Sequence, residues 1–477
     1  MAAWYSASFD ESRLPARAVN TSRTVIRCLG PWRPDLLRAH QAAPTRFPFL
    51  LESASVGSKQ GRYDLLLAAT PDLEPLVLHA NRRLTGPSAD TGSFLAALDQ
   101  LWAQERQGTD TTQSLPFLGG WFLYLGYELA ADIEPSLRLP IGTLPIAVAT
   151  RVCAAAIYDH EAGTTWVVAE SGHEEVLDRL QAVLHPSSPE EETLPAMPPM
   201  VLTEEEPSHY RLAVSRALEY IAAGDIYQAN LAREWRGVLA AGVDPALLYA
   251  HLRRANPGPF AAFAVLPGMT VLSTSPERLV SSRHGRVETR PIAGTRPRRG
   301  DDATMAAELR ANLKEQAEHV MLLDLERNDL GRICEAGTVE VDEYMSIESY
   351  AHVHHIVSNV RGQQRAGVTP GQIIRAVFPG GTITGCPKVR CMQLIAELEG
   401  KARGAYTGSL GYLGRDGSLD LNILIRTATV MARADGVREL SLKAGAGIVA
   451  DSDPDRELDE TRAKARGLIR GLGAERA

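Results

Sequence analysis

Cysteine is scarce in this sequence, and long apolar runs are absent. Five cysteines occur among 477 residues, and no two of them form a CxxC pair. We therefore expect neither a disulfide framework nor a thiolate zinc site. No run of about 18 uncharged apolar residues is present to span a membrane, and the N-terminal MAAWYSASFDESRL lacks the apolar segment of a signal peptide. These absences predict a cytoplasmic protein that does not associate with membranes.

An excess of basic residues is also missing. Lysine and arginine total 50 against 58 aspartate and glutamate residues, which gives a net charge of −8. A chain of this charge is not expected to bind nucleic acid through a broad electrostatic surface. Hydrophobic residues make up 44% of the chain and charged residues 23%, a balance that predicts a soluble protein with a large core.

Proline, glutamate and serine concentrate in residues 186–207, which predicts a linker or surface loop. This stretch separates an N-terminal region, residues 1–185, from a C-terminal region, residues 208–472. In both, strand-like runs come in pairs and helical segments in blocks, which predicts an α+β fold of antiparallel sheets packed against helices. The helices expected in the C-terminal region are Ser208–Ala223, Ala303–Leu323, Pro370–Val377, Pro387–Leu398 and Pro454–Leu472.

Two groups of acidic residues have helical spacing. Glu315 and Glu318 are three residues apart and would share one helix face. Glu457, Glu460 and Lys464 would form a second stripe. Each group alone is typical of a solvated helix face. Together they favour a Mg²⁺ site, because proteins hold this ion with carboxylates, substrate oxygens and water.

Glycine-dense backbone and one arginine indicate a site for an anion. Ala444–Val449 and Gly380–Lys388 could bring backbone N–H groups close to an anion, although tight turns explain them equally well. The first stretch is not a dinucleotide loop, because no βαβ unit surrounds it. Arg426 lies inside an apolar strand expected over Asn422–Ala432, and a buried arginine needs an anionic partner. These residues predict a Mg²⁺-dependent site for a small polycarboxylate.

A dense series of motifs runs through the C-terminal region. They include STSPERL (273–279), TRPIAGTRPRRG (289–300), KEQAEHVMLLDLERNDLGR (314–332), FPGGTITGCPKVRCM (378–392) and AGAGIVADSDPDRELDETRAKA (444–465). In this order they resemble the chorismate-utilising enzymes, which include anthranilate synthase component I and aminodeoxychorismate synthase component I. The resemblance implies the sandwich of antiparallel sheets and helices of that family.

The resemblance also implies a role for individual positions. The implied Mg²⁺ ligands are Glu318 and Glu460, with Glu315 and Glu457 next to the metal or its waters. The groups implied around the substrate carboxylates are Tyr406, Arg426, Gly445, Gly447 and Lys464. His355 and Thr295 are implied to line the pocket. Glu277 matches the general acid that protonates the departing C4 hydroxyl of chorismate.

Three features bear on which family member this is. Gln228 stands where water-using members carry a lysine, which implies ammonia as the nucleophile and disfavours isochorismate or salicylate synthesis. Ala293 replaces the nucleophilic lysine of most aminodeoxychorismate synthases, as it does in anthranilate synthases, and alanine cannot be a nucleophile. The GGTITG stretch, however, resembles the aminodeoxychorismate synthase form. We favour the alanine-motif branch of aminodeoxychorismate synthases, which serves 4-aminobenzoate and folate synthesis, and keep anthranilate synthase component I as the alternative.

Two further stretches resemble the tryptophan feedback site of anthranilate synthases. The residues of this predicted tryptophan site are Leu51, Glu52, Ser53, Asn256, Pro257 and Phe260. Phe260 replaces the usual tyrosine, which argues against inhibition. The sequence has no glutaminase nucleophile elbow, so we expect a separate glutamine amidotransferase subunit to supply ammonia in a heterodimer. A remote alternative is a non-catalytic regulatory subunit that binds chorismate or tryptophan, for which Glu277 would be unnecessary.

Overall fold

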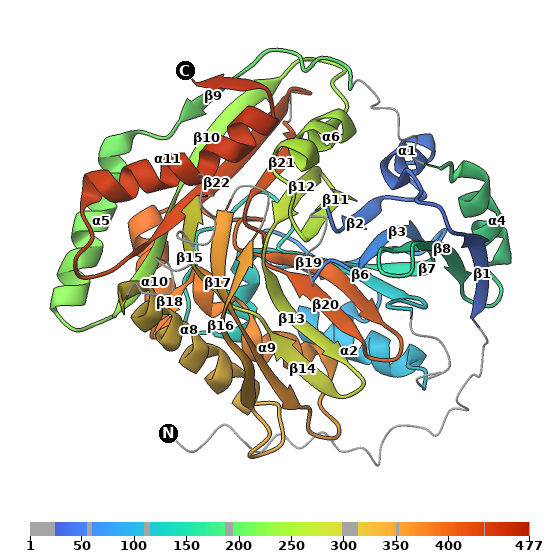
Figure 1. Ribbon diagram of the computed structural model, residues 1–477, viewed down its shortest axis with the longest axis horizontal. Coiled ribbons are helices and arrows are strands. Elements are labelled where there is room, and N and C mark those ends of the chain that lie inside the picture. The colour runs from blue at the N-terminus through green and yellow to red at the C-terminus, as the bar shows by residue number, and fades with distance from the viewer. Residues whose placement is uncertain are drawn as a thin grey trace.

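Antiparallel strands form the layers of the molecule, and helices lie on their outer faces (Figure 1). This arrangement confirms the predicted α+β fold. No helix within the described ranges has the length and apolarity that a membrane span requires. The computed structural model describes residues 24–54, 60–108, 115–186, 194–297, 313–349, 353–433 and 435–476.

Strand β7 organises the N-terminal part, because it pairs with β3, β4, β6 and β8. The strands of this part are β1 (Val25–Gly30), β2 (Phe49–Glu52), β3 (Tyr63–Ala69), β4 (Leu76–Leu78), β5 (Leu84–Thr85), β6 (Gly120–Leu125), β7 (Ala147–Asp159) and β8 (Thr164–Ala169). Its helices are α1 (Leu36–Ala42), α2 (Phe94–Glu105), α3 (Ala130–Ile133) and α4 (Glu174–Val183). In Figure 1, α4 lies against β8 at the right-hand end.

The remaining strands continue the antiparallel pattern, apart from the parallel pair β9–β23. They are β9 (Met200–Glu204), β10 (Gln228–Leu239), β11 (Phe260–Leu266), β12 (Met269–Ser275), β13 (Arg278–Arg283), β14 (Arg286–Thr289), β15 (Ile292–Pro297), β16 (Glu340–Ser349), β17 (Val353–Gln363), β18 (Gly385–Cys386), β19 (Ser409–Gly414), β20 (Leu419–Asn422), β21 (Thr427–Ala432), β22 (Arg438–Ile448) and β23 (Ala474–Arg476). The helices are α5 (Pro207–Ala222), α6 (Pro245–Ala255), α8 (Leu313–Gly331), α9 (Pro370–Val377), α10 (Lys388–Glu399), α11 (Pro454–Gly471) and the short 3₁₀ helix η4 (Gly381–Ile383).

Strands from the two predicted regions pair with each other. β2 pairs with β11, and β6 pairs with β19. Within the predicted linker, Met200–Glu204 forms β9, which pairs with β10. The sheet is therefore continuous across the two predicted regions. The division of the chain at residues 186–207 stays a prediction.

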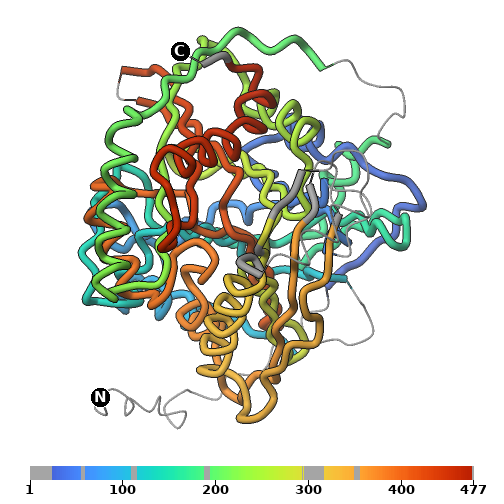
Figure 2. The backbone as a smooth tube through the Cα atoms, turned by 60° about the vertical axis from the view of Figure 1, so that its left-hand side comes forward, coloured from blue at the N-terminus to red at the C-terminus, as the bar shows by residue number. Residues whose placement is uncertain are grey.

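The β10–β22 ladder forms the wall that carries much of the predicted site. Its register runs from Ala229 opposite Ile448 to Leu239 opposite Arg438. α5, α10 and α11 gather around it, at the left of Figure 1, and Figure 2 shows α5 and α11 side by side from a second direction. Buried apolar side chains from these helices and both strands fill the space between them, and burial of each valine, leucine or isoleucine contributes about 1.5–3 kcal/mol.

Two expected elements have different bounds in the structure. α8 continues to Gly331 instead of ending at Leu323, because Leu330 stays on the buried face beyond the charged residues ERND. The expected start at Ala303 lies outside the described residues. The strand expected over Asn422–Ala432 is wrong: β20 ends at Asn422 and β21 begins at Thr427. A continuous apolar run cannot reveal such a break, since both halves are buried.

Candidate active site

Two glycines of β22 allow other side chains to lie directly against the strand. A Cβ atom on Gly447 would lie 2.5 Å from Nε2 of Gln228, and one on Gly445 would lie 2.7 Å from the Tyr406 hydroxyl. Real Cβ contacts are longer than this, so any larger residue would displace these groups. Because Gly445 and Gly447 have no side chains, Tyr406 and Gln228 can pack directly against β22.

Gln228 connects β10 to α8. Its Nε2 donates a hydrogen bond to Oε1 of Glu318 at 3.1 Å. Gln228 is 4% exposed, and its Oε1 accepts no hydrogen bond within the described part of the chain. The same Glu318 oxygen lies 3.7 Å from the Cβ position on Gly447. A buried amide oxygen without a partner is costly, which indicates that a bound group satisfies it.

The C-terminal helix α11 reaches the same strand. Nζ of Lys464 donates to the carbonyl oxygen of Gly445 at 3.0 Å and lies 2.8 Å from Oε1 of Glu460. Glu460 is about half exposed, and Glu457 lies partly buried one turn earlier. Lys464 therefore offers a cation beside the glycine strand, while Glu460 points toward solvent beside it.

Arg426 occupies the break between β20 and β21 in a left-handed backbone conformation, with φ of 53°. Such a conformation costs a non-glycine residue on the order of 1–3 kcal/mol and occurs mainly where function requires it. Nη1 donates to the carbonyl oxygen of Lys464 at 2.9 Å. Burial lowers the pKa of Arg426, and no carboxylate of the described residues forms an ion pair with it. A desolvated guanidinium of this kind is suited to an anionic ligand.

Glu277 lies in the turn between β12 and β13. It is 4% exposed, and Oε1 makes no hydrogen bond within the described ranges. Burial raises the pKa of Glu277 to about 8, and the nearby Glu326 carboxyl adds to the effect. The N–H of Ile423 donates to the Glu277 carbonyl oxygen at 3.0 Å, which joins this turn to the segment that carries Arg426. Glu277 is thus a carboxyl that stays protonated at neutral pH.

Other predicted residues lie on neighbouring elements. Burial raises the pKa of Tyr406 to about 12, so its hydroxyl remains a hydrogen-bond donor. In the β15–β17 register, Thr295 lies opposite the buried His355 and Ala293 opposite Ile356. The side chains of Ala293, Thr295 and Glu315 lie outside the described residues, so their roles stay predictions.

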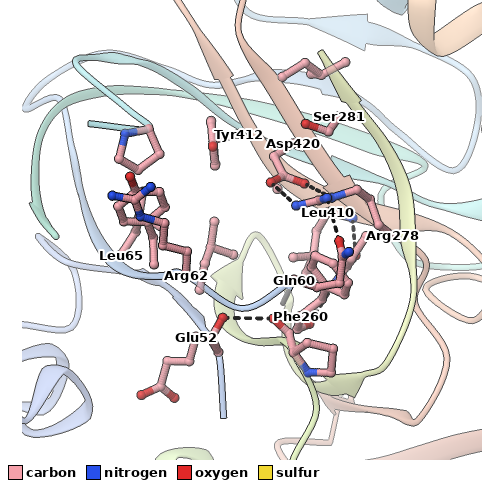
Figure 3. Close-up of a pocket in the computed structure, with 18 of the residues that line it drawn as sticks. Glu52, Gln60, Arg62, Leu65, Phe260, Arg278, Ser281, Leu410, Tyr412 and Asp420 are labelled. Carbon is pink, nitrogen blue, oxygen red and sulfur yellow. Dashed lines mark hydrogen bonds and ion pairs between the residues drawn. The ribbon is translucent and has the colours of Figure 1, made fainter. Parts of the chain in front are cut away.

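A cavity of about 250 Å³ lies near the predicted tryptophan site (Figure 3). We call it the second cavity to distinguish it from the candidate active site. Leu51, Ser53 and Phe260 line it, whereas Asn256 and Pro257 do not. The Arg278–Asp420 ion pair closes one side (Figure 3). Glu52 also borders the cavity, and Figure 3 shows its carboxylate turned away from Arg278 and Asp420.

The Glu52 carboxylate is held by the helix α6. It accepts hydrogen bonds from the Tyr249 hydroxyl at 2.7 Å and from Nη1 of Arg253 at 2.7 and 3.0 Å. Asn256, at the end of the same helix, donates to Thr274 Oγ1 at 2.8 Å. These two predicted ligand residues therefore support the wall of the cavity, and Leu51, Ser53 and Phe260 are the ones available to a ligand.

Comparison with known proteins identifies the family. The sequence profile described as chorismate binding enzyme matches residues 62–470. The chain belongs to this family.

Relatives within the chorismate-binding enzymes carry two names. Aminodeoxychorismate synthase component 1 of Bacillus subtilis is 40% identical over 382 residues, which cover 76% of this chain and 79% of that protein. Anthranilate synthase component 1 of Thermus thermophilus is 38% identical over 453 residues, covering 91% and 94%. The structure of anthranilate synthase component I from Streptococcus pneumoniae has a TM-score of 0.74 at 30% identity, covering 87% of this chain and 93% of that one. The chain is therefore a chorismate-utilising enzyme, and its relatives include both amination types.

The residues present are chemically suited to the Mg²⁺ ion that the family resemblance implies. Carboxylate and amide oxygens are the hard ligands that Mg²⁺ prefers, and Glu318, Glu460 and the unpartnered Oε1 of Gln228 supply them around one glycine strand. Among the described residues, no three His, Cys, Asp or Glu side chains cluster closely enough to form a complete site.

Sequence reasoning missed two buried residues of α8. His319 Nε2 lies 2.6 Å from Ser358 Oγ, and burial lowers the pKa of His319 to about 4, so a neutral imidazole joins α8 to β17. Glu326 is 6% exposed. Neither stood out, because a histidine or glutamate in a charged helical run is usually solvated. The only signal in the sequence was their helical spacing. His319 lies four residues after Glu315, and Glu326 lies three residues after Leu323, on a helix with a buried face.

Proposed function

We propose that the protein aminates chorismate to 4-amino-4-deoxychorismate, with ammonia from a separate glutamine amidotransferase subunit, for 4-aminobenzoate and folate synthesis. The observation that supports amination of chorismate is the buried acid Glu277 on a turn joined to the Arg426 segment, and the GGTITG stretch favours 4-amino-4-deoxychorismate as the product. A reaction that expels a hydroxyl needs a proton donor, and a dicarboxylate substrate needs cations. Both features occur side by side here.

Glu277 acts as the general acid. Its raised pKa keeps the proton on the carboxyl at neutral pH, and the absence of a cation partner leaves that proton available. In the proposed reaction, ammonia adds at C2 of chorismate while the C4 hydroxyl takes the Glu277 proton and leaves as water. A second ammonia then adds at C4 and expels the first, so the net reaction exchanges one hydroxyl for one amine.

The substrate carboxylates lie among cations and donors from β22, α11, the break between β20 and β21, and the segment before β19. Arg426 and Lys464 supply positive charge, and the Tyr406 hydroxyl and the N–H groups of Gly445 and Gly447 supply hydrogen-bond donors. Glu318 and Glu460, with Glu315 and Glu457 beside them, would hold Mg²⁺, which would supply positive charge to one substrate carboxylate. Removal of Mg²⁺ with a chelator should abolish turnover and leave the fold intact by circular dichroism.

The amide of Gln228 supports ammonia over water as the nucleophile. A lysine at this position could accept a proton from water, whereas an amide has no basic nitrogen and here donates to Glu318. Purified protein should therefore turn over chorismate with ammonium salts but not with glutamine alone. Turnover with glutamine alone would contradict the proposal of a separate amidotransferase subunit.

Anthranilate synthase component I is the second candidate, because Ala293 and several relatives favour it. Product identity separates the two. The protein is incubated with chorismate, Mg²⁺ and ammonium salt, and the products are resolved by liquid chromatography and mass spectrometry. A product that aminodeoxychorismate lyase converts to 4-aminobenzoate supports the proposal, and anthranilate formed without the lyase replaces it with the alternative.

The second cavity is proposed to hold tryptophan as a structural ligand. Its apolar wall includes Leu51 and Phe260, and Arg278 lies with its guanidinium carbon 4.9 Å from the centre of the Phe260 ring. Tryptophan should raise the melting temperature more than phenylalanine does, and the difference should disappear in Ser53→Trp, which fills the cavity. Equal shifts for both amino acids would contradict the proposal.

A further inference from the structure

Glu326 is a buried carboxyl for which the proposed reaction has no assigned use. It lies on α8, 6% exposed, and within the described residues no lysine or arginine forms an ion pair with it. Lys388 of α10, whose charge acts on Glu326, donates to Asp329 instead. A buried carboxyl without its own cation is expensive to retain, so its surroundings are informative.

A two-residue segment of η4 separates Glu326 from the acid Glu277. A Cβ on Gly381 would lie 3.3 Å from Oε1 of Glu326, a tight contact that glycine avoids. The next residue, Thr382, lies beside the Glu277 carboxyl. The buried Thr382 hydroxyl and the backbone at Ile292 favour the charged form of Glu277, but burial and the Glu326 carboxyl outweigh them and raise its pKa. The glycine-dense stretch Gly380–Lys388 thus lies next to both Glu326 and Glu277. This is a role in addition to the anion binding that the sequence predicted for it.

When two buried carboxyl groups lie close together, the negative charge of one opposes the ionisation of the other. Burial raises the pKa of Glu326 to about 7 and that of Glu277 to about 8. The Lys388 cation favours the charged form of Glu326, whereas no cation of the described residues acts on Glu277 in this way. Glu326 is therefore the carboxyl that carries the negative charge, and this charge opposes the loss of the proton from Glu277. The two carboxyls titrate as a coupled pair.

Several described charged groups near α8 have partners of their own. Asp329 is bound by Lys388, and Arg332 lies 3.7 Å from it. On β17, Arg361 pairs with Glu340 and Asp342. On α9, Arg375 donates to a backbone carbonyl, and β17 also carries the buried His355. Of these groups, Asp329 and Lys388 act on Glu326 directly, with opposite signs.

We propose that Glu326 is a positioning residue for the acid step: its carboxylate keeps Glu277 protonated at and slightly above neutral pH. The inference rests on the proposed role of Glu277 and adds the group that holds the proton there. It holds for either amination product, since both reactions expel the same hydroxyl.

The test is the pH profile of kcat in Glu326→Gln, with free ammonia held at one concentration at every pH. The basic limb, where Glu277 loses its proton, should move to lower pH by about one unit, the size of a like-charge interaction at short range. Glu326→Met, also uncharged, should shift it equally, and Glu326→Asp should stay near wild type. Asp324→Asn removes an exposed charge from the same helix and should not move the limb.

Two results would overturn the inference. One is a basic limb that stays in place in folded Glu326→Gln and Glu326→Met. The other is an equal shift in Glu326→Asp, which would indicate repacking of α8 instead of charge. Infrared titration of the protonated-carboxyl band that disappears in Glu277→Gln gives a second readout independent of turnover. If Glu277→Gln remains fully active, the proposed acid is wrong, while the infrared shift still tests the carboxyl pair.

Discussion

Glu277 and Glu52 are almost equally buried, at 4% and 6% exposure, but their surroundings differ. Glu52 accepts hydrogen bonds from Arg253 and Tyr249 beside the second cavity. Glu277 has an oxygen without a partner and a raised pKa. The comparison teaches that burial alone does not mark a reacting carboxyl. The missing cation separates these two glutamates, because a paired carboxylate stabilises the structure around it whereas an unpaired acid can give up its proton.

The strongest test of this contrast is Glu277→Gln. Turnover should fall about 10²–10⁴-fold, the usual contribution of a general acid, because an amide cannot protonate the leaving hydroxyl. Chorismate should still bind, since the cations around its carboxylates are unchanged, and isothermal titration calorimetry would measure this. Unchanged turnover would remove Glu277 from the mechanism and revive the regulatory-subunit alternative.

The matching change beside the second cavity is Glu52→Gln. It leaves Arg253 without its carboxylate and should lower the free energy of unfolding by about 3 kcal/mol, measured by urea denaturation. Activity per folded molecule should stay near that of wild type. Glu52→Gln combined with Arg253→Met should recover part of the stability, and failure to recover any would show that the pair is not the cause.

The pH dependence of stability should also distinguish the two glutamates. The pKa of Glu277 is about 8 in the folded protein, above the ordinary value near 4.3 that applies when unfolded. Between these values unfolding releases a proton, so the contribution of Glu277 to stability falls as pH rises and levels off above about 8. Glu277→Gln should therefore be more stable than wild type by a margin that is larger at about pH 8 than at about pH 5. A margin independent of pH would contradict the raised pKa.

A smaller effect is expected from Gly447→Ala. The new methyl group would displace the Gln228 amide and, through it, Glu318, and misplacement of a binding group by a fraction of an ångström should weaken chorismate binding about 10-fold. Gly331→Ala is the control, because open space surrounds that glycine and its φ is not positive. Equal effects of the two changes on KM would show that Gly447 has no special place in the site.

Much of the fold was predictable because its periodicity is local. The helix Pro370–Val377 has the predicted bounds, since Thr369 and Gln372 form a capping box that the sequence displays. The break at Arg426 was not predictable, because the partners of Arg426 are distant in sequence: Thr274 of β12 donates to its carbonyl oxygen, and its side chain donates to Lys464 of α11. The family resemblance pointed to Gln228, Glu318 and Gly447 in the sequence. That these residues lie together depends on the register of β10 and β22, which the sequence does not reveal. Glu326 looked like a solvated helix residue, and only the approach of Gly381 makes it an interior one.

The pairing of β2 with β11 and of β6 with β19 has a consequence for how the gene could be divided. If residues 1–185 and 208–472 were expressed as separate chains, each would expose two unsatisfied strand edges, which are templates for aggregation. The halves should therefore be insoluble alone and recover when co-expressed. Exchange of one half between relatives would succeed only if both edge strands keep their partners' side-chain pattern, so the two halves are expected to be inherited together.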